Sequence, residues 1–328
     1  MKASAITRIV IYSLVALILC GILAAGMGLG RFVFDLAGDN GNYITGGSSL
    51  PKEEIEHLQI EWVSGSVDVT IVPAHEANIT FSETGGTENC SMVYEVKGHT
   101  LIIRYEKPRV QIGFGNWSTP DKALTVEIPA EWNLQSIDIS SVSADVNILQ
   151  INSGDVDVEN VSGSTEVRVL EAGDVDIETV SGRVTFIGAC KKLNMNSVSG
   201  DCDVFLDGTA QEISYEGVSG DLKVSVFKEQ GFTAKLDSVS GNIYSDFSTT
   251  VSGGAHSYGD GSLRITADTV SGDIQITESR IEFTDRCSHV WDEGDLRSVP
   301  GDTRQEMVYT CLICGSTKSE PVNETKEE

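Results

Sequence analysis

Basic residues and catalytic motifs are both scarce in this chain. Of its 328 residues, Lys and Arg make up 23 and Asp and Glu 49, so the formal net charge is −26. A chain this acidic is repelled by nucleic acid and by anionic lipid, which argues against DNA or RNA as a partner. No His-Glu-x-x-His, Gly-x-Ser-x-Gly or Walker-type sequence is present. We therefore expect a binding or structural protein rather than an enzyme.

Charge is also missing from a run near the N-terminus. Ile9–Gly30 has no charged residue, and Lys2 and Arg8 precede it. A helix rising about 1.5 Å per residue would span a hydrocarbon core of about 30 Å over this length. Because the positive residues come first, we expect residues 1–34 to be a cytoplasmic stub and transmembrane helix, with the bulk of the chain extracytoplasmic. The alternative is a cleaved signal peptide, which would remove residues 1–28 and make the protein secreted.

A tripeptide, Val-Ser-Gly, recurs along the second half of the chain. Its copies begin at Val161, Val180, Val198, Val218, Val239 and Val270, and Val142-Ser143-Ala144 is a near copy. Successive spacings from Val142 are 19, 19, 18, 20, 21 and 31, the last lengthened by a Gly- and Ser-rich insertion at residues 249–261. Apolar residues stand three and five positions before each valine and four and six after it, except for Thr165 and Ser245. This period of two puts each apolar pair on one side of a strand.

The pattern predicts an all-β fold, a parallel β-solenoid with about 20 residues per coil. One coil has an apolar face and unpaired backbone groups, and a second coil about 4.8 Å away would pair the groups and bury the face. Glycine permits backbone angles at the corner that a side chain would forbid. A conventional β-sandwich that reuses the tripeptide is the alternative.

A further copy of the tripeptide, Val63-Ser64-Gly65, lies far upstream with the same apolar columns around it. Residues 73–135, which lack the repeat, separate it from the main series. We expect this insert to cap the N-terminal end of the solenoid, which would otherwise expose an unpaired edge. It contains four candidate strands and a hairpin turn at Gly98-His99. The strands are expected at Asn78–Phe81, Ser91–Val96, Thr100–Tyr105 and Leu124–Ile128.

Three of these features together resemble a known family. The Val-Ser-Gly-Asp-Val-x-Val strands, the Ile128-Pro129 step and the N-terminal anchor are similar to the bacterial putative-adhesin family of β-strand-repeat proteins, over roughly residues 55–280. The resemblance implies an envelope-associated protein, in some cases linked to envelope stress. It carries over no catalytic residues.

The C-terminal tail has different chemistry. Cys287 and His289 form a Cys-x-His pair, and Cys311 and Cys314 form a Cys-x-x-Cys pair followed by Gly315. Two such pairs suit a closed, tetrahedral structural zinc site, and the tail resembles the knuckle of a zinc ribbon. A disulfide among the three cysteines is the competing interpretation, since thiols outside the membrane tend to oxidise. A third interpretation is that these cysteines bind no metal and form no disulfide.

Aspartates recur at fixed places in the repeat. Asp145, Asp201, Asp221 and Asp273 share the position three residues after the valine, and Asp155 and Asp174 share another. Stacking would bring like charges close together, and bound Ca²⁺ would relieve their repulsion. A solvated surface row is the simpler interpretation. Of the other cysteines, Cys202 stands in an apolar column and is expected to pack as a small buried hydrophobe, Cys20 lies in the uncharged run, and the sequence gives no role to Cys90 and Cys190.

We expect a membrane-anchored, extracytoplasmic solenoid that acts as an adhesin-like binding or stress-associated scaffold for envelope protein or polysaccharide. The alternative is a parallel β-helix enzyme acting on envelope polysaccharide, for which residues 249–261 would supply His256, Tyr258 and Asp260. The expected divisions are residues 1–34 (stub and anchor), 35–54 (flexible linker), 55–140 (N-terminal β part and cap), 141–283 (solenoid) and 284–328 (zinc-knuckle-like module and acidic tail).

Overall fold

The computed structural model describes residues 43–72, 78–85, 91–105, 121–130, 132–206, 210–279, 295–298, 305–310 and 317–321. In these ranges the chain is nearly all strand, and its one helical segment is the single 3-10 turn η1 (Lys52–Glu54). The expected all-β class is confirmed. None of the described residues lies in a helix long and apolar enough to cross a membrane. The anchor expected at residues 1–34 falls outside the described ranges.

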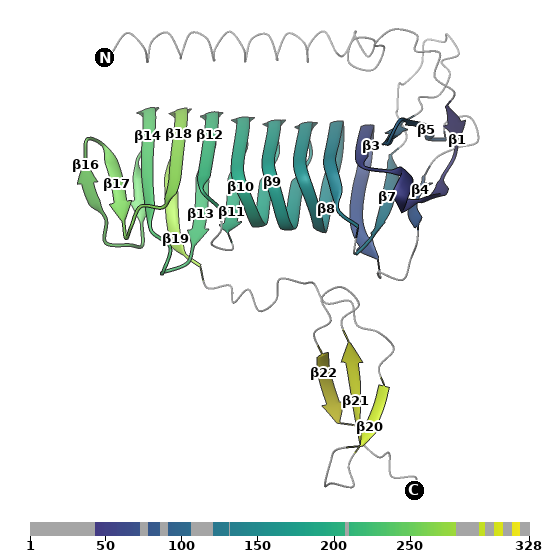
Figure 1. The fold of residues 1–328 in the computed structure, drawn as a ribbon. Coiled ribbons are helices and arrows are strands. Elements are labelled where there is room, and N and C mark those ends of the chain that lie inside the picture. Colours follow the sequence, from purple (N-terminus) through teal and green to yellow (C-terminus); the bar gives the residue numbers. More distant parts are fainter. Residues whose placement is uncertain are drawn as a thin grey trace, which may run out of the picture.

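The repeat forms a stack of parallel coils (Figure 1). Three long strands, β8 (Leu134–Ser162), β9 (Thr165–Ser181) and β10 (Val184–Ser199), each end at the serine of a tripeptide and pair in parallel. Their register joins equivalent positions of the repeat, so that Val156 lies beside Val175 and Val175 beside Leu193. The predicted alignment of the coils is therefore confirmed. Each coil is named after its tripeptide valine.

The core is a set of straight apolar columns inside the coils. The two columns before the corner and the two after it are buried, as in Val158, Ile177, Phe186 and Val204. Each such side chain stabilises the fold by about 1.5–3 kcal/mol relative to an exposed one. Cys202 lies in the predicted column between Val184 and Leu222 and is buried, as expected.

The coils are not stacked in sequence order at the C-terminal end. The Val218 coil comprises β12 (Glu212–Ser219) and β13 (Leu222–Val226), and it pairs in parallel with the Val270 coil, β18 (Leu263–Ser271) and β19 (Ile274–Glu278). The Val270 coil then pairs on its other side with the Val239 coil, β14 (Phe232–Ser240) and β15 (Ile243–Ser245). The last repeat in sequence is thus the second-to-last in space (Figure 1).

The insertion within the last interval is a hairpin that closes this end of the stack. Its strands, β16 (Thr250–Ser252) and β17 (Ala255–Tyr258), pair antiparallel, and β17 also pairs antiparallel with β14. Tyr258 packs with Phe247 and Phe232, at ring-centroid separations of 4.6 and 5.7 Å. The hairpin covers an edge that the stack would otherwise leave unpaired.

The upstream tripeptide is the first member of the main stack. It lies in β3 (His57–Val72), which pairs in parallel with β8 so that Ser64 faces Ser143 and Val67 faces Val146. On its other side β3 pairs in parallel with β6 (Thr100–Arg104) and β7 (Lys122–Pro129). β6 and β7 thus lie beyond the first coil, on the side where the cap was expected. The same sheet also contains β4 (Asn78–Thr84), β5 (Val93–Lys97) and β11 (Cys202–Leu206).

The expected hairpin turn at Gly98-His99 joins β5 to β6, which pair antiparallel. The flexible linker expected over residues 35–54 is wrong from Ile44 onward. There β1 (Ile44–Thr45) and β2 (Ser48–Pro51) pair antiparallel with β5 and β4. The exposed edge of the cap recruits these short strands because they supply the backbone partners that it lacks.

A separate three-stranded antiparallel sheet lies within the predicted C-terminal module. Its strands are β20 (Asp295–Ser298), β21 (Gln305–Thr310) and β22 (Thr317–Pro321). The register of β21 and β22 joins Thr310 to Thr317. Cys311 and Cys314 therefore fall in the sequence between two paired strands.

Candidate functional site

The aspartates at the corner of each coil form the row that the repeat predicts. The Asp201 carboxylate accepts a hydrogen bond from the Asp221 backbone N–H at 3.1 Å, and Asp221 accepts one from the Asp273 N–H at 2.9 Å. Asp273 in turn accepts the Asn242 N–H at 2.8 Å, which follows the spatial order of the coils. Each carboxylate therefore satisfies a backbone donor in the next coil, a structural role.

The remaining corner aspartate and the second aspartate row behave similarly. Asp145 accepts the backbone and side-chain donors of Ser164, both at 2.8 Å, and Asp155 accepts the Asp174 N–H at 3.2 Å. Among the described residues, no three His, Cys, Asp or Glu side chains converge as metal ligands do. Calcium at these rows stays a prediction.

A second acidic surface runs along the outward side of the strands that precede the corner. Asp157 pairs in register with Asp176, and Glu159 with Glu178, so carboxylates stand in two adjacent rows. We call Asp138, Asp157, Glu159, Asp176 and Glu178 the acidic face. Two amides of β10 border it: Asn194 donates to Asp176 at 2.7 Å and Asn196 to Glu178 at 3.0 Å.

Crowding on the acidic face alters its titration. Partial burial along the ladder raises the pKa of Asp157, and repulsion from Glu159, Asp176 and Glu178 raises it further. Burial also raises the pKa of Asp138 and of Glu159, with neighbouring carboxylates adding to both. Like charges this close favour a bound cation or a basic partner over open solvent.

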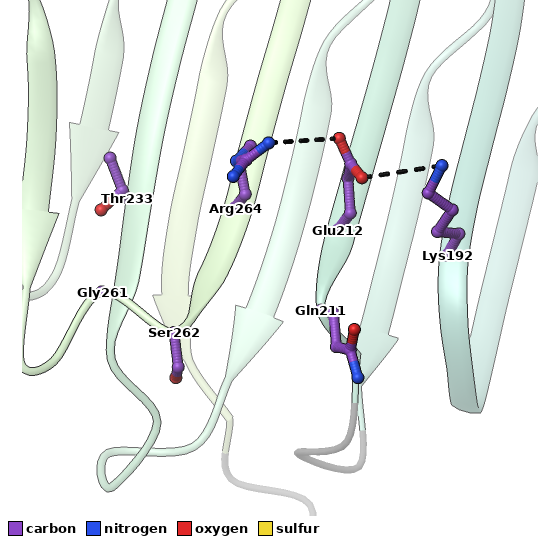
Figure 2. Close-up of a pocket in the computed structure, with 7 residues that line it drawn as sticks. All are labelled: Lys192, Gln211, Glu212, Thr233, Gly261, Ser262 and Arg264. Carbon is purple, nitrogen blue, oxygen red and sulfur yellow. Dashed lines mark ion pairs between the residues drawn. The ribbon is translucent and has the colours of Figure 1, made fainter.

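A pocket of about 560 Å³ opens beside the start of the strands that precede the corner, toward the C-terminal end of the stack. Lys192, Glu212 and Arg264 come from three successive coils and point to the same side (Figure 2). The Glu212 carboxylate lies between the two cations, 3.7 Å from Lys192 Nζ and 3.8 Å from Arg264 Nη1. Gln211, Thr233 and Ser262 also line the pocket.

The predicted zinc ligands, Cys287, His289, Cys311 and Cys314, all lie outside the described residues. Zinc and its disulfide alternative therefore both stay predictions. Cys190 and Cys202 are both buried. Burial raises the pKa of the Cys202 thiol to about 12, so it stays protonated and unreactive at neutral pH.

The residues proposed for an enzyme do not gather into a groove. Tyr258 packs in the aromatic cluster of the hairpin and its hydroxyl donates to the Lys228 carbonyl at 3.0 Å. Asp260 accepts the Ser262 backbone N–H at 3.0 Å, a turn contact, and His256 Nδ1 lies 3.4 Å from the Thr249 hydroxyl. Each of these contacts lies within or beside the hairpin that closes the stack.

Sequence reasoning missed the acidic face and the pocket. The sequence does contain a signal for the acidic face, because acidic residues alternate with the apolar columns before the corner. The corner aspartates repeat more strictly and so gave the stronger pattern. The pocket had no such signal. It depends on Arg264 lying beside Glu212, which requires the coils to be out of sequence order.

Comparison with known proteins gives a family match. The model of the family described as Toastrack DUF4097 matches residues 55–189 and 187–277, which together span the cap and the stack. No curated protein matches the chain.

Several solved structures are similar at low identity. A "putative adhesin" from Bacteroides fragilis is 14% identical, covering 72% of this chain and 97% of its own, with a TM-score of 0.42. A "putative cell adhesion protein" from Clostridium sporogenes is 14% identical, covering 73% and 100%, with a TM-score of 0.31. A "putative lipid binding protein" from Parabacteroides distasonis is 17% identical, covering 72% and 97%, with a TM-score of 0.37.

Proposed function

This chain belongs to the Toastrack DUF4097 family, and from that premise we propose that it is an adhesin-like binding scaffold of the cell envelope. The observation that carries the proposal is the acidic face. The stack packs its inward side chains into the core and holds outward ones in straight rows at fixed spacing. Such a surface suits repeated contacts with an extended partner rather than conversion of a small substrate.

The partner that best fits the acidic face is a basic segment of an envelope protein, or a polysaccharide bridged to the carboxylates by Ca²⁺. Asp157 and Glu159 reach solvent, and crowding with partial burial raises their pKa values, so a cation would relieve repulsion that solvent only partly screens. Nucleic acid would be repelled by the net charge of −26.

We further propose that residues 1–34 anchor the protein in the membrane, with the solenoid extracytoplasmic. The support is the uncharged run Ile9–Gly30 behind Lys2 and Arg8. Cleavage of residues 1–28 would give the same placement without the anchor.

The C-terminal module is proposed to be a structural zinc knuckle formed by Cys287, His289, Cys311 and Cys314. Its support is that β21 and β22 pair antiparallel, so the Cys-x-x-Cys sequence falls between two strands of a hairpin. Zinc-ribbon ligands are typically presented in such a place.

The scaffold proposal is tested by capture of envelope components on the immobilised full-length chain, with and without Ca²⁺. We expect capture to fall at least several-fold in a variant with Asp157→Asn, Glu159→Gln, Asp176→Asn and Glu178→Gln. The matched control neutralises four corner or loop acids away from this face: Asp145→Asn, Asp201→Asn, Glu229→Gln and Asp273→Asn. Equal loss in both variants would mean that net charge, and not the acidic face, drives capture.

A further inference from the structure

The pocket beside Glu212 is assembled by the out-of-order coil. Lys192 is on β10, Glu212 on β12 and Arg264 on β18, and the register places Glu212 directly between the other two. In a stack that followed the sequence, Thr233 of the Val239 coil would stand beside Glu212 instead. The inserted coil therefore converts an ordinary row into a site with two cations around one carboxylate (Figure 2).

The charge at this place is opposite to that of the molecule. Of the ion pairs in which both partners are described residues, this is the one group in which cations outnumber carboxylates. Asp174 precedes Lys192 in the same row, but it forms no ion pair with it among these contacts. The pocket thus carries local positive charge within a protein of net charge −26.

The donors of the two cations remain available. Their separations from Glu212, 3.7 and 3.8 Å, exceed the roughly 2.7–3.2 Å of a normal N–H···O hydrogen bond. The side chains of Lys192 and Arg264 are 48% and 68% exposed. Glu212 therefore holds the two cations near each other without consuming their hydrogen bonds.

We propose that this pocket binds an acidic sugar, with its carboxylate or phosphate between Lys192 and Arg264. An Arg guanidinium binds either group through two parallel hydrogen bonds, and the Lys ammonium adds a point charge. The sugar hydroxyls face Gln211, Thr233 and Ser262, which supply amide and hydroxyl groups. A volume of about 560 Å³ lies in the range of small-ligand sites, roughly 300–1,000 Å³, and accommodates one or two sugar rings.

This inference rests on the proposed envelope role, because it names acidic sugars as the ligand at one site of the proposed envelope scaffold. The inference also predicts that Glu212 weakens the binding of an anion, whereas Lys192 and Arg264 strengthen it. The carboxylate orients both cations but repels an incoming anion, so its removal should strengthen anion binding while removal of either cation weakens it. A purely structural ion-pair network would lose function on all three changes.

The test uses full-length protein in a polyoxyethylene detergent, which has neither sugar nor phosphate. Saturation-transfer NMR measures binding of glucuronate, glucose 6-phosphate and glucose. We expect the two acidic sugars to bind with millimolar dissociation constants and glucose at least about tenfold more weakly. Preference for glucose 6-phosphate would assign phosphate as the natural group, and preference for glucuronate would assign carboxylate.

Variants decide whether the pocket is responsible. Arg264→Gln and Lys192→Gln should each weaken glucuronate binding by about tenfold, the loss expected for a charge-assisted hydrogen bond. Glu212→Gln should tighten it several-fold. Lys223→Gln, which changes a cation on the strand after the corner, should leave it unchanged. Unfolding midpoints measured for all four variants verify that they are folded.

Three results would overturn the inference: equal affinity for glucose, no loss with Arg264→Gln, or weaker binding with Glu212→Gln. None of them bears on capture of envelope components through the acidic face. If capture persists while acidic sugars fail to bind, the pocket inference fails alone. If acidic sugars bind while capture is absent, the scaffold proposal fails alone.

Discussion

Lys122 and Glu83 form a buried ion pair at the N-terminal cap, with Lys122 Nζ 2.9 Å from Glu83 Oε2. The two side chains are 0% and 8% exposed. The ammonium also lies 4.1 Å from the centroid of the Tyr105 ring, a cation–π geometry. The pair joins the start of β7 to the end of β4, so it holds the cap strands in place around the first coil.

Replacing Lys122 with Met should destabilise the protein by about 3–5 kcal/mol, because Glu83 would be left buried without its partner. The double variant Lys122→Met/Glu83→Gln should recover a large part of that loss. Arg168→Met is the control. It breaks an exposed ion pair with Glu166 and should cost about 1 kcal/mol or less. Urea unfolding measures all three, and equal cost for both single variants would contradict the prediction.

Gly220 shows why the tripeptide ends in glycine. Its φ is +131°, and a Cβ there would lie 2.2 Å from the Gly200 carbonyl oxygen of the preceding coil. Gly220→Ala should therefore force the two coils apart and cost more than about 2 kcal/mol. Gly98→Ala is the matched control, with φ +64° but no atom within 4 Å, and should cost about 1 kcal/mol. Thermal unfolding that ranks the two in the reverse order would refute the steric argument.

How much of this could be read from sequence differs between the coils and their order. The tripeptide fixes register because a one-residue slip would turn Val156 and Val175 outward, so the columns were predictable. The order was not. The Val239 and Val270 coils both offer small or branched apolar residues at the same inward positions, as Ala234 and Ile265 illustrate. The apolar pattern alone therefore does not distinguish which of the two coils lies beside the Val218 coil.

Neutralising Asp157 should stabilise the protein at pH 7. Its pKa is raised in the folded state, so the native chain binds that proton more tightly than the unfolded chain does. Its contribution to stability therefore falls as pH rises above about 4, and its charge destabilises the fold at neutral pH. Asp157→Asn should raise the unfolding midpoint at pH 7 in low salt, with a smaller gain in about 1 M salt and little near pH 3. An equal gain at pH 3 would mean that the effect is not electrostatic.

Zinc content tests the C-terminal module directly. We expect about one equivalent of zinc per chain by elemental analysis after reducing purification, because four protein ligands close a tetrahedral site. Cys314→Ser and His289→Ala should each reduce it below about half an equivalent. Cys190→Ala, which changes a buried cysteine of the solenoid, should leave it unchanged. Zinc near zero in the parent chain, together with a disulfide detected by mass spectrometry, would contradict the zinc site and support the disulfide.

The order of the coils predicts which truncation is harmful. A chain ending at Ser262 lacks β18 and β19, so the Val239 coil loses the coil that joins it to the Val218 coil. The core residues Phe232 and Ala234 would then lose their neighbours Leu263 and Ile265. Hydrogen exchange should show the amides of residues 236–240 of β14, which lie beyond the pairing with β17, protected in a chain ending at Ser279 and unprotected in one ending at Ser262. If the coils instead stacked in sequence order, the shorter chain would merely lose its last coil, and β14 would stay protected against β12.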